Sequence, residues 1–265
     1  MGVNFSQYKN EVIKLNDNPL ATIFGFTTRL PAISATRAGI PIASYYGYIV
    51  DGIIKDDEEA AKAPKFGTYT RAGVFNFRDV NGDGVITAAD RTIIGSPHPD
   101  FTYGLNLNLG YKNFDLTVFA QGSQGNKIFN YVRYWTDFNT FQGNRSTDLL
   151  YNSWKKSGDV ASLPRLNSGD ATSQQISTYF LEDGSYMRIK NIQLTYTIPA
   201  SALKKVGLGS AQIYIQGQNL FTITNYSGYD PEVNSFGKGE SLSLGTDYNA
   251  YPNYKSYLVG VKFDF

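Results

Sequence analysis

The feature that most constrains this chain is a strict alternation of apolar and polar side chains over stretches of about ten residues. It is clearest in residues 101–111, where apolar residues occupy every second position: Tyr103, Leu105, Leu107, Leu109 and Tyr111. Glycine and asparagine fill the positions between them. Successive side chains of a β-strand point to opposite faces of the sheet, so a period of two predicts a strand with one apolar and one polar face.

The alternation resumes directly after Lys112 and Asn113, in residues 114–121. Two such stretches separated by two residues predict a β-hairpin with a tight turn. Asparagine tolerates a positive φ better than most residues, so we expect Asn113 to adopt it.

Further strands are predicted along the second half of the chain. Residues 186–198 and 211–221 alternate in the same way, and the segment between them reads as one short helical turn that ends at Gly207. The last strand covers residues 254–265, and a weaker alternation in residues 2–15 predicts an additional early strand. The total is about six strands.

The length of these strands indicates a membrane barrel. A strand of about 9 to 11 residues crosses a bilayer at a tilt, whereas strands of soluble sheets average about 5 or 6. The connections alternate between short and long, which is typical of bacterial barrels with short periplasmic turns and long extracellular loops. We therefore predict an all-β fold, part of a transmembrane antiparallel β-barrel, because six strands are fewer than the roughly eight of the smallest such barrels.

The alternation of short and long connections assigns each connection to one side of the membrane and so divides the chain into two regions. Counted back from a periplasmic C-terminus, residues 17–100 form a large extracellular loop region, and residues 101–265 supply barrel strands and loops. On this interpretation residues 1–265 are the C-terminal segment of a larger barrel. The alternative is a soluble β-domain with one solvated face.

A second motif, residues 79–90, has the spacing of a calcium-binding loop. Oxygen-bearing groups stand at loop positions 1, 3, 5, 7, 9 and 12, namely Asp79, Asn81, Asp83, the carbonyl of Val85, Thr87 and Asp90. Glycine at position 6 allows the sharp turn, and the last position carries aspartate instead of the usual glutamate. We expect these six residues to form a structural calcium site. The alternative is a turn rich in Asp, Asn and Gly without an ion.

Composition argues against several classes of function. The chain has 24 Lys plus Arg against 23 Asp plus Glu, so it lacks the basic field that nucleic-acid binding requires. It contains no cysteine and a single histidine, His98, in a proline-flanked segment that reads as a connector. No paired acid and base is visible, so we predict that the protein is not an enzyme.

One long connection is rich in aromatic residues. They are Phe129, Tyr131, Tyr134, Trp135, Phe138, Phe141 and, further on, Trp154. Such side chains could stack on a sugar or peptide or bind a partner, or they could pack on one another. The sequence leaves both interpretations open.

Several short motifs follow one another in a characteristic order. They are GIPIASYYGYIVDG at 39–52, FRDVNGDGVIT at 77–87, DRTIIGSPHPDFTYG at 90–104, FAQGSQGNKIFN at 119–130, YMRIKN at 186–191, QNLFT at 218–222 and YDPEV at 229–233. In this succession the chain resembles the SusC/RagA-type TonB-dependent outer-membrane receptors of Bacteroidetes.

The resemblance implies a 22-stranded barrel with an N-terminal plug domain and a TonB box, neither of which matches any residues of this chain. It also implies a SusD-like surface lipoprotein as partner, energy from the TonB complex through the plug, and a glycan or peptide as substrate. The expected function is TonB-dependent nutrient import across the outer membrane. The alternative is a secreted, calcium-stabilised β-domain for adhesion or ligand binding.

Overall fold

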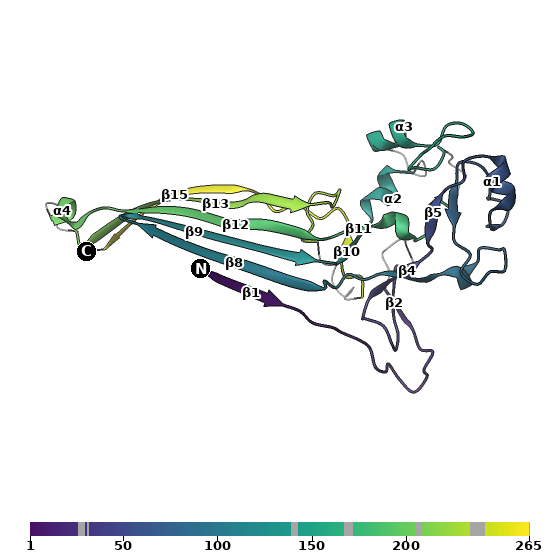
Figure 1. The fold of residues 1–265 in the computed structure, drawn as a ribbon, viewed down its shortest axis with the longest axis horizontal. Coiled ribbons are helices and arrows are strands. Elements are labelled where there is room, and N and C mark those ends of the chain that lie inside the picture. Colours follow the sequence, from purple (N-terminus) through teal and green to yellow (C-terminus); the bar gives the residue numbers. More distant parts are fainter. Residues whose placement is uncertain are drawn as a thin grey trace.

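The structure is a computed structural model that describes residues 1–25, 30, 32–138, 143–166, 172–204, 208–233 and 242–264. Figure 1 shows a long sheet that carries, at one end, a head built from short strands and helices. The N-terminus and the C-terminal strand both belong to the long sheet.

The long sheet has six strands, and every neighbouring pair is antiparallel. In spatial order they are β1 (Gly2–Ser6), β8 (Phe101–Tyr111), β9 (Phe114–Gln124), β12 (Tyr186–Thr197), β13 (Ser210–Thr224) and β15 (Ser256–Asp264). The two predicted hairpins are present, as β8 with β9 and β12 with β13.

The register of the sheet keeps apolar and polar side chains on separate faces. Leu107 lies opposite Val118, and Leu194 lies opposite both Leu116 and Ile215. The apolar positions of neighbouring strands therefore lie on one face, because paired residues share a face. This apolar face is exposed, as the 54% exposure of Ile215 illustrates. The opposite face carries Asn, Gln and Thr side chains and is called the inner face below.

Two details differ from the sequence prediction. The first strand ends at Ser6 and does not continue to residue 15, because the alternation is lost after Tyr8 and the chain leaves the sheet. In the two-residue turn between β8 and β9, the positive φ of 54° belongs to Lys112 and not to Asn113. The predicted ends at Gly207 and Phe265 lie outside the described residues, although the short helix α4 (Ala200–Leu203) does form between β12 and β13.

The sheet is irregular at one point on β12. The register shifts between Ile189 and Asn191 on both sides of the strand, so Lys190 is an extra residue. A bulge of this kind lets one residue leave the alternation without disturbing the rest of the strand. Apolar residues consequently return to the apolar face at Ile192.

The head consists of short elements from distant parts of the chain. Its strands are β2 (Ile23–Gly25), β3 (Ser34–Thr36), β4 (Ser44–Gly47), β5 (Val50–Ile53), β6 (Phe75–Phe77), β7 (Thr92–Gly95), β10 (Lys127–Asn130), β11 (Leu181–Asp183) and β14 (Thr246–Asp247). Its helices are α1 (Asp57–Lys62), η1 (Ala88–Asp90), α2 (Val132–Thr136), α3 (Thr147–Asn152) and η2 (Thr178–Phe180). The strands form sheets ordered β2-β3-β4-β7, β11-β10-β14 and β5-β6.

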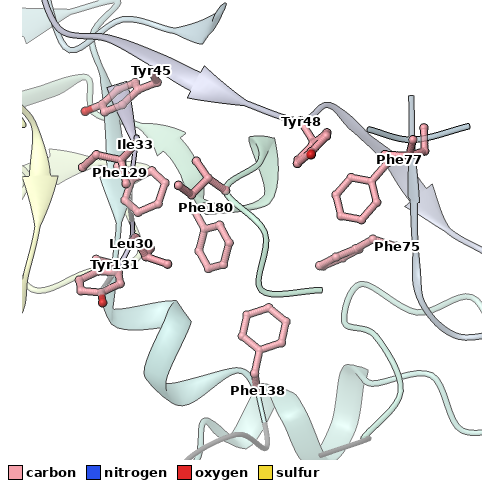
Figure 2. Close-up of a cluster of buried hydrophobic side chains, with 12 residues drawn as sticks. Leu30, Ile33, Tyr45, Tyr48, Phe75, Phe77, Phe129, Tyr131, Phe138 and Phe180 are labelled. Carbon is pink, nitrogen blue, oxygen red and sulfur yellow. The ribbon is translucent and has the colours of Figure 1, made fainter. Parts of the chain in front are cut away.

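An aromatic core holds the head together. Figure 2 shows rings from several elements around Phe180, among them Phe129, Phe138 and Phe75. The rings of Phe129 and Phe180 stack with centroids 5.4 Å apart, and the ring of Phe138 lies 5.9 Å from that of Phe180. Three of the aromatic residues singled out in the sequence, Phe129, Tyr131 and Phe138, are therefore buried and pack on one another. Phe141 lies outside the described residues.

None of the helices in the described part of the chain is long and apolar enough to cross a membrane.

Candidate functional site

The loop predicted to bind calcium lies at the surface of the head, between β6 and η1. Asp79 accepts hydrogen bonds from the backbone N–H groups of Gly82 and Gly84, both at 2.7 Å. Asp83 accepts one from Val85 at 2.9 Å. Gly82 and Gly84 have φ values of 78° and 81°, which explains why glycine occupies both positions.

Asp90 closes this loop from inside the head. Its side chain is fully buried, and its carboxylate accepts from the N–H groups of Val80 at 3.0 Å and Thr87 at 2.7 Å. Burial alone would raise the pKa of Asp90, but these backbone hydrogen bonds outweigh it and hold the pKa below its ordinary value. Asp90 is therefore a charged anchor that joins the two ends of the loop.

The six predicted ligands, Asp79, Asn81, Asp83, Val85, Thr87 and Asp90, lie in this loop, where side-chain hydrogen bonds join Asn81 to Asp83 and Thr87 to Asp90. The carboxylates are hydrogen-bonded to the backbone, and among the described residues no three His, Cys, Asp or Glu side chains are arranged to hold a metal ion. Calcium binding by this loop stays a prediction.

Replacement of Asp90 by alanine should loosen this loop. The N–H groups of Val80 and Thr87 belong to exposed residues and would lose their acceptor, which costs about 1 kcal/mol for each hydrogen bond. Hydrogen exchange of these two amides in the full-length protein measures the effect, with Asp83→Ala as the control, since Asp83 is exposed. Unchanged exchange in Asp90→Ala would contradict the anchoring role. If the loop binds calcium, added calcium should slow exchange in the wild type but not in Asp83→Ala.

A network of charged residues lies on the inner face of the long sheet, and we call it the inner-face ion network: Arg188, Lys190, Asp230 and Glu232. Arg188, on β12, is only 4% exposed. Its guanidinium donates to both oxygens of Asp230, at 2.7 and 3.3 Å, and also contacts Glu232. Lys190, the bulge residue, donates to Glu232 at 2.7 Å.

The inner-face ion network attaches a connecting segment to the sheet. Asp230 and Glu232 belong to the segment 225–233, which follows β13. Neutral groups of three further elements complete the network: Arg188 donates to Thr222 on β13, Gln121 on β9 donates to Glu232, and the backbone N–H of Asn253 donates to Asp230. The segment is therefore attached to β9 and β12, and Arg188, its main partner on β12, is itself hydrogen-bonded to β13.

Asp230 keeps its negative charge at neutral pH. Burial alone would raise the pKa of Asp230, but hydrogen bonds from Arg188 and from the backbone N–H groups of Glu232 and Asn253 lower it below its ordinary value. A carboxylate with a lowered folded-state pKa stabilises the fold above its unfolded pKa of about 3.9, and this contribution is lost as the pH falls through the folded-state value. The contribution of Asp230 to the attachment is thus fully present at neutral pH and is lost only in acid.

The sequence did not predict this network. Arg188, Asp230 and Glu232 belong to two of the short motifs quoted above, but they are 42 and 44 residues apart and nothing in their spacing pairs them. The one signal was a positive charge at a polar-face position of an alternating strand.

His98 has a structural environment. Its Nδ1 lies 3.2 Å from the hydroxyl of Tyr8, and its Nε2 lies 2.8 Å from the carbonyl of Ile42. The imidazole thus connects the N-terminal segment to the head. Both ring nitrogens are engaged, which leaves neither directed at a substrate.

A wide sheet of long antiparallel strands, apolar on the exposed face and polar on the other, is typical of the wall of an outer-membrane β-barrel. No protein-family model matches the chain. It is 36% identical to TonB-dependent receptor P3 of Formosa agariphila, over 99% of this chain and 26% of that receptor. It is 33% identical to the TonB-dependent receptor SusC of Bacteroides thetaiotaomicron, over 71% of this chain and 17% of SusC.

Solved structures show the same likeness. The structure of the RagAB peptide transporter aligns with a TM-score of 0.76 and 26% identity, over 99% of this chain and 27% of that one. The chain belongs to the SusC/RagA family of TonB-dependent receptors, and its long sheet is part of the receptor's β-barrel. It spans about a quarter of the length of P3 and of the RagAB chain.

Proposed function

We propose that this chain is the C-terminal part of the barrel of an outer-membrane importer that takes up a glycan or peptide with energy from the TonB complex. The observation that carries the proposal is the two-faced six-stranded sheet, whose outer strands β1 and β15 each have one unpaired edge among the described residues. Unpaired backbone groups are costly in lipid, so further strands of the same receptor would complete the wall.

A SusD-like lipoprotein at the cell surface is the proposed partner. Two similarities support it: one relative is the TonB-dependent receptor SusC, and a solved structure of similar fold is that of the RagAB peptide transporter. On this proposal the head faces the outside of the cell, because it occupies the end of the sheet opposite the two short turns. Membership in a receptor family favours this function over the secreted adhesion domain.

Deletion of the receptor gene tests import directly. Growth of the mutant with single glycans or peptides as carbon source should fail on one cargo class, and a plasmid copy should restore it. Growth on the corresponding monosaccharides or amino acids should not change, because small molecules pass through porins. Undiminished growth on every cargo would contradict the proposed function. Co-purification of a lipoprotein with the tagged receptor tests the partner.

A further inference from the structure

A groove of about 220 Å³ lies where the long sheet meets the head, and we call it the boundary groove. Its lining comes from the ends of β8, β9, β11, β12 and β13 and from residues next to them. Figure 1 shows this junction, where β9 and β12 end beside β10 and β11. The boundary groove shares no residue with the calcium-type loop or with the inner-face ion network, so it is a separate feature of the molecule.

One side of the boundary groove belongs to the apolar face of the sheet, where Tyr103, Met187 and Ile223 line it. They form one row across the wall, because Met187 pairs with Ile223 on one side and with Gly122, the partner of Tyr103, on the other. The row shares its face with Leu107, which follows Tyr103 by four residues on β8. A Cβ at Gly122 would lie 2.3 Å from Cζ of Tyr103. The Tyr103 ring therefore covers the backbone of Gly122 and gives the groove an apolar floor.

This apolar side continues the surface that contacts lipid. The long sheet is part of the receptor's barrel, so its apolar face lies against lipid tails. Ile223, at the head end of that face, is 66% exposed. The boundary groove is therefore an extension of an interface with lipid.

Aromatic rings mark the level at which the wall leaves the bilayer. At the head end of β8, the ring of Phe101 lies 5.2 Å from that of Phe5 and 6.2 Å from that of Tyr103. Tyr111 stands at the other end of this strand, about 34 Å away at about 3.4 Å per residue. A tilt of about 40° turns this length into about 26 Å across the membrane, close to the roughly 25 Å of the apolar band that aromatic girdles flank in outer-membrane barrels. Gln124 lines the boundary groove and pairs with Phe101, so the groove lies at the edge of this band.

The other side of the boundary groove is polar. Gln124, Asp183 and Ser185 line it, and Asp183 is the only charged residue of the lining. Oδ1 of Asp183 accepts from the backbone N–H of Ser185 at 3.1 Å and from its hydroxyl at 2.7 Å, whereas no described residue donates to Oδ2. Burial alone would raise the pKa of Asp183, but hydrogen bonds from Ser185 and the charge of Lys127 hold it below its ordinary value. The lining thus offers a charged acceptor and no basic group.

The two sides of the groove together select a ligand. An acyl chain suits the apolar side, and a headgroup that donates hydrogen bonds suits the carboxylate, whereas a phosphate alone would find no basic residue in the lining. We propose that the boundary groove holds one lipid with an ammonium headgroup from the leaflet next to the head. Its chain packs on Tyr103, Met187 and Ile223, and its ammonium donates to Asp183. The site needs only the barrel wall and does not depend on import.

Native mass spectrometry of the full-length receptor in detergent tests the site. Three lipids with identical acyl chains serve as probes: phosphatidylethanolamine, phosphatidylcholine and phosphatidylglycerol. The first two carry the same charge, but the choline nitrogen has no N–H to donate. Phosphatidylethanolamine should therefore bind at least about fivefold more tightly than phosphatidylcholine, the factor that one hydrogen bond contributes. Equal binding of these two lipids, or tighter binding of the anionic phosphatidylglycerol, would overturn the proposal.

Two variants locate the lipid. Asp183→Asn keeps an acceptor for Ser185 and should therefore fold, but it should lower the binding of phosphatidylethanolamine to the level of phosphatidylcholine. Ile223→Ala should weaken both lipids about threefold, because it removes apolar surface that the chain covers. A preference for phosphatidylethanolamine that persists in Asp183→Asn would contradict the assigned role of the carboxylate.

Two matched controls lie outside the boundary groove. Ile215→Ala removes an exposed apolar side chain from the same face of β13, and Glu58→Gln removes an exposed carboxylate from α1. Both variants should bind lipid like the wild type. Weakening by Ile215→Ala equal to that by Ile223→Ala would also overturn the proposal, since it would show general adhesion of lipid to the wall.

The outcome for lipid binding is separable from the outcome for import. Binding is measured without transport, so a receptor that binds phosphatidylethanolamine but supports growth on no cargo would contradict the proposed function and leave the groove assigned. A receptor that imports its cargo but shows no preference among the three lipids would contradict the groove and leave the proposed function intact.

Discussion

Arg188→Ala is expected to release the segment 225–233 from the inner face of the barrel. The substitution would remove most of the positive charge that neutralises Asp230 and Glu232, while both carboxylates remain largely buried. Removal of one partner of a buried ion pair costs about 3–5 kcal/mol, mainly because the other charge is left uncompensated. In the full-length receptor at pH 7, limited proteolysis should cut within the segment 225–233, and the temperature at which the barrel loses its heat-modifiable form should fall.

Lys190→Ala is the matched control, because Lys190 forms an ion pair only with Glu232 among the described residues and its side chain is a quarter exposed. Its effect should be at most about 1 kcal/mol, as for other partly exposed ion pairs. The double variant Arg188→Met with Asp230→Asn should be more stable than Arg188→Ala, since it removes one of the stranded charges. Proteolysis of Arg188→Ala at the wild-type rate would show that Arg188 does not hold the segment.

The long sheet could be predicted from the sequence because its information is local. A period of two is visible within each strand, and it fixes both the strand and the face to which each side chain points. Leu107 and Val118 lie eleven residues apart across a two-residue turn, so the hairpin also follows from local sequence. The bulge at Lys190 is harder to predict, because one extra polar residue cannot be told from an ordinary irregularity in the alternation of apolar and polar residues.

The head could not be predicted in the same way. Its strands are two to four residues long, too short for a period to appear, and several of them have partners that are distant in the chain. Phe129 on β10 pairs with Thr246 on β14, and its ring packs on Phe180. The sequence marked Phe129 and Trp135 alike as aromatic loop residues, yet Phe129 is fully buried in the core and Trp135 is only partly buried at its edge. Only the tertiary contacts separate them.

The candidate sites show the same division. The calcium-type loop is a local motif, so its candidate ligands follow from spacing alone, and calcium binding stays a prediction. Arg188 and Asp230 are ordinary polar residues in sequence, and they become distinctive only through burial and through partners in other elements.

Leu107→Arg is expected to prevent stable assembly of the barrel in the outer membrane. Leu107 lies near the middle of β8 on the apolar face, opposite Val118. An arginine that faces lipid near the bilayer midplane costs about 2–4 kcal/mol. The folded yield, measured as the heat-modifiable fraction in purified outer membranes, should therefore fall severalfold.

Asn106→Arg is the matched control for Leu107→Arg. Asn106 precedes Leu107 on the same strand, points to the inner face, and is exposed there. An arginine at this position should change stability by no more than about 0.5 kcal/mol, because its charge would lie on the polar side of the sheet. A soluble sheet whose apolar face packs in a core would also reject Leu107→Arg, so the decisive measurement is depth. A fluorophore attached at Leu107→Cys should be quenched by bromine on lipid tails and one at Asn106→Cys should not, and equal quenching at both positions would exclude the assignment of the two faces.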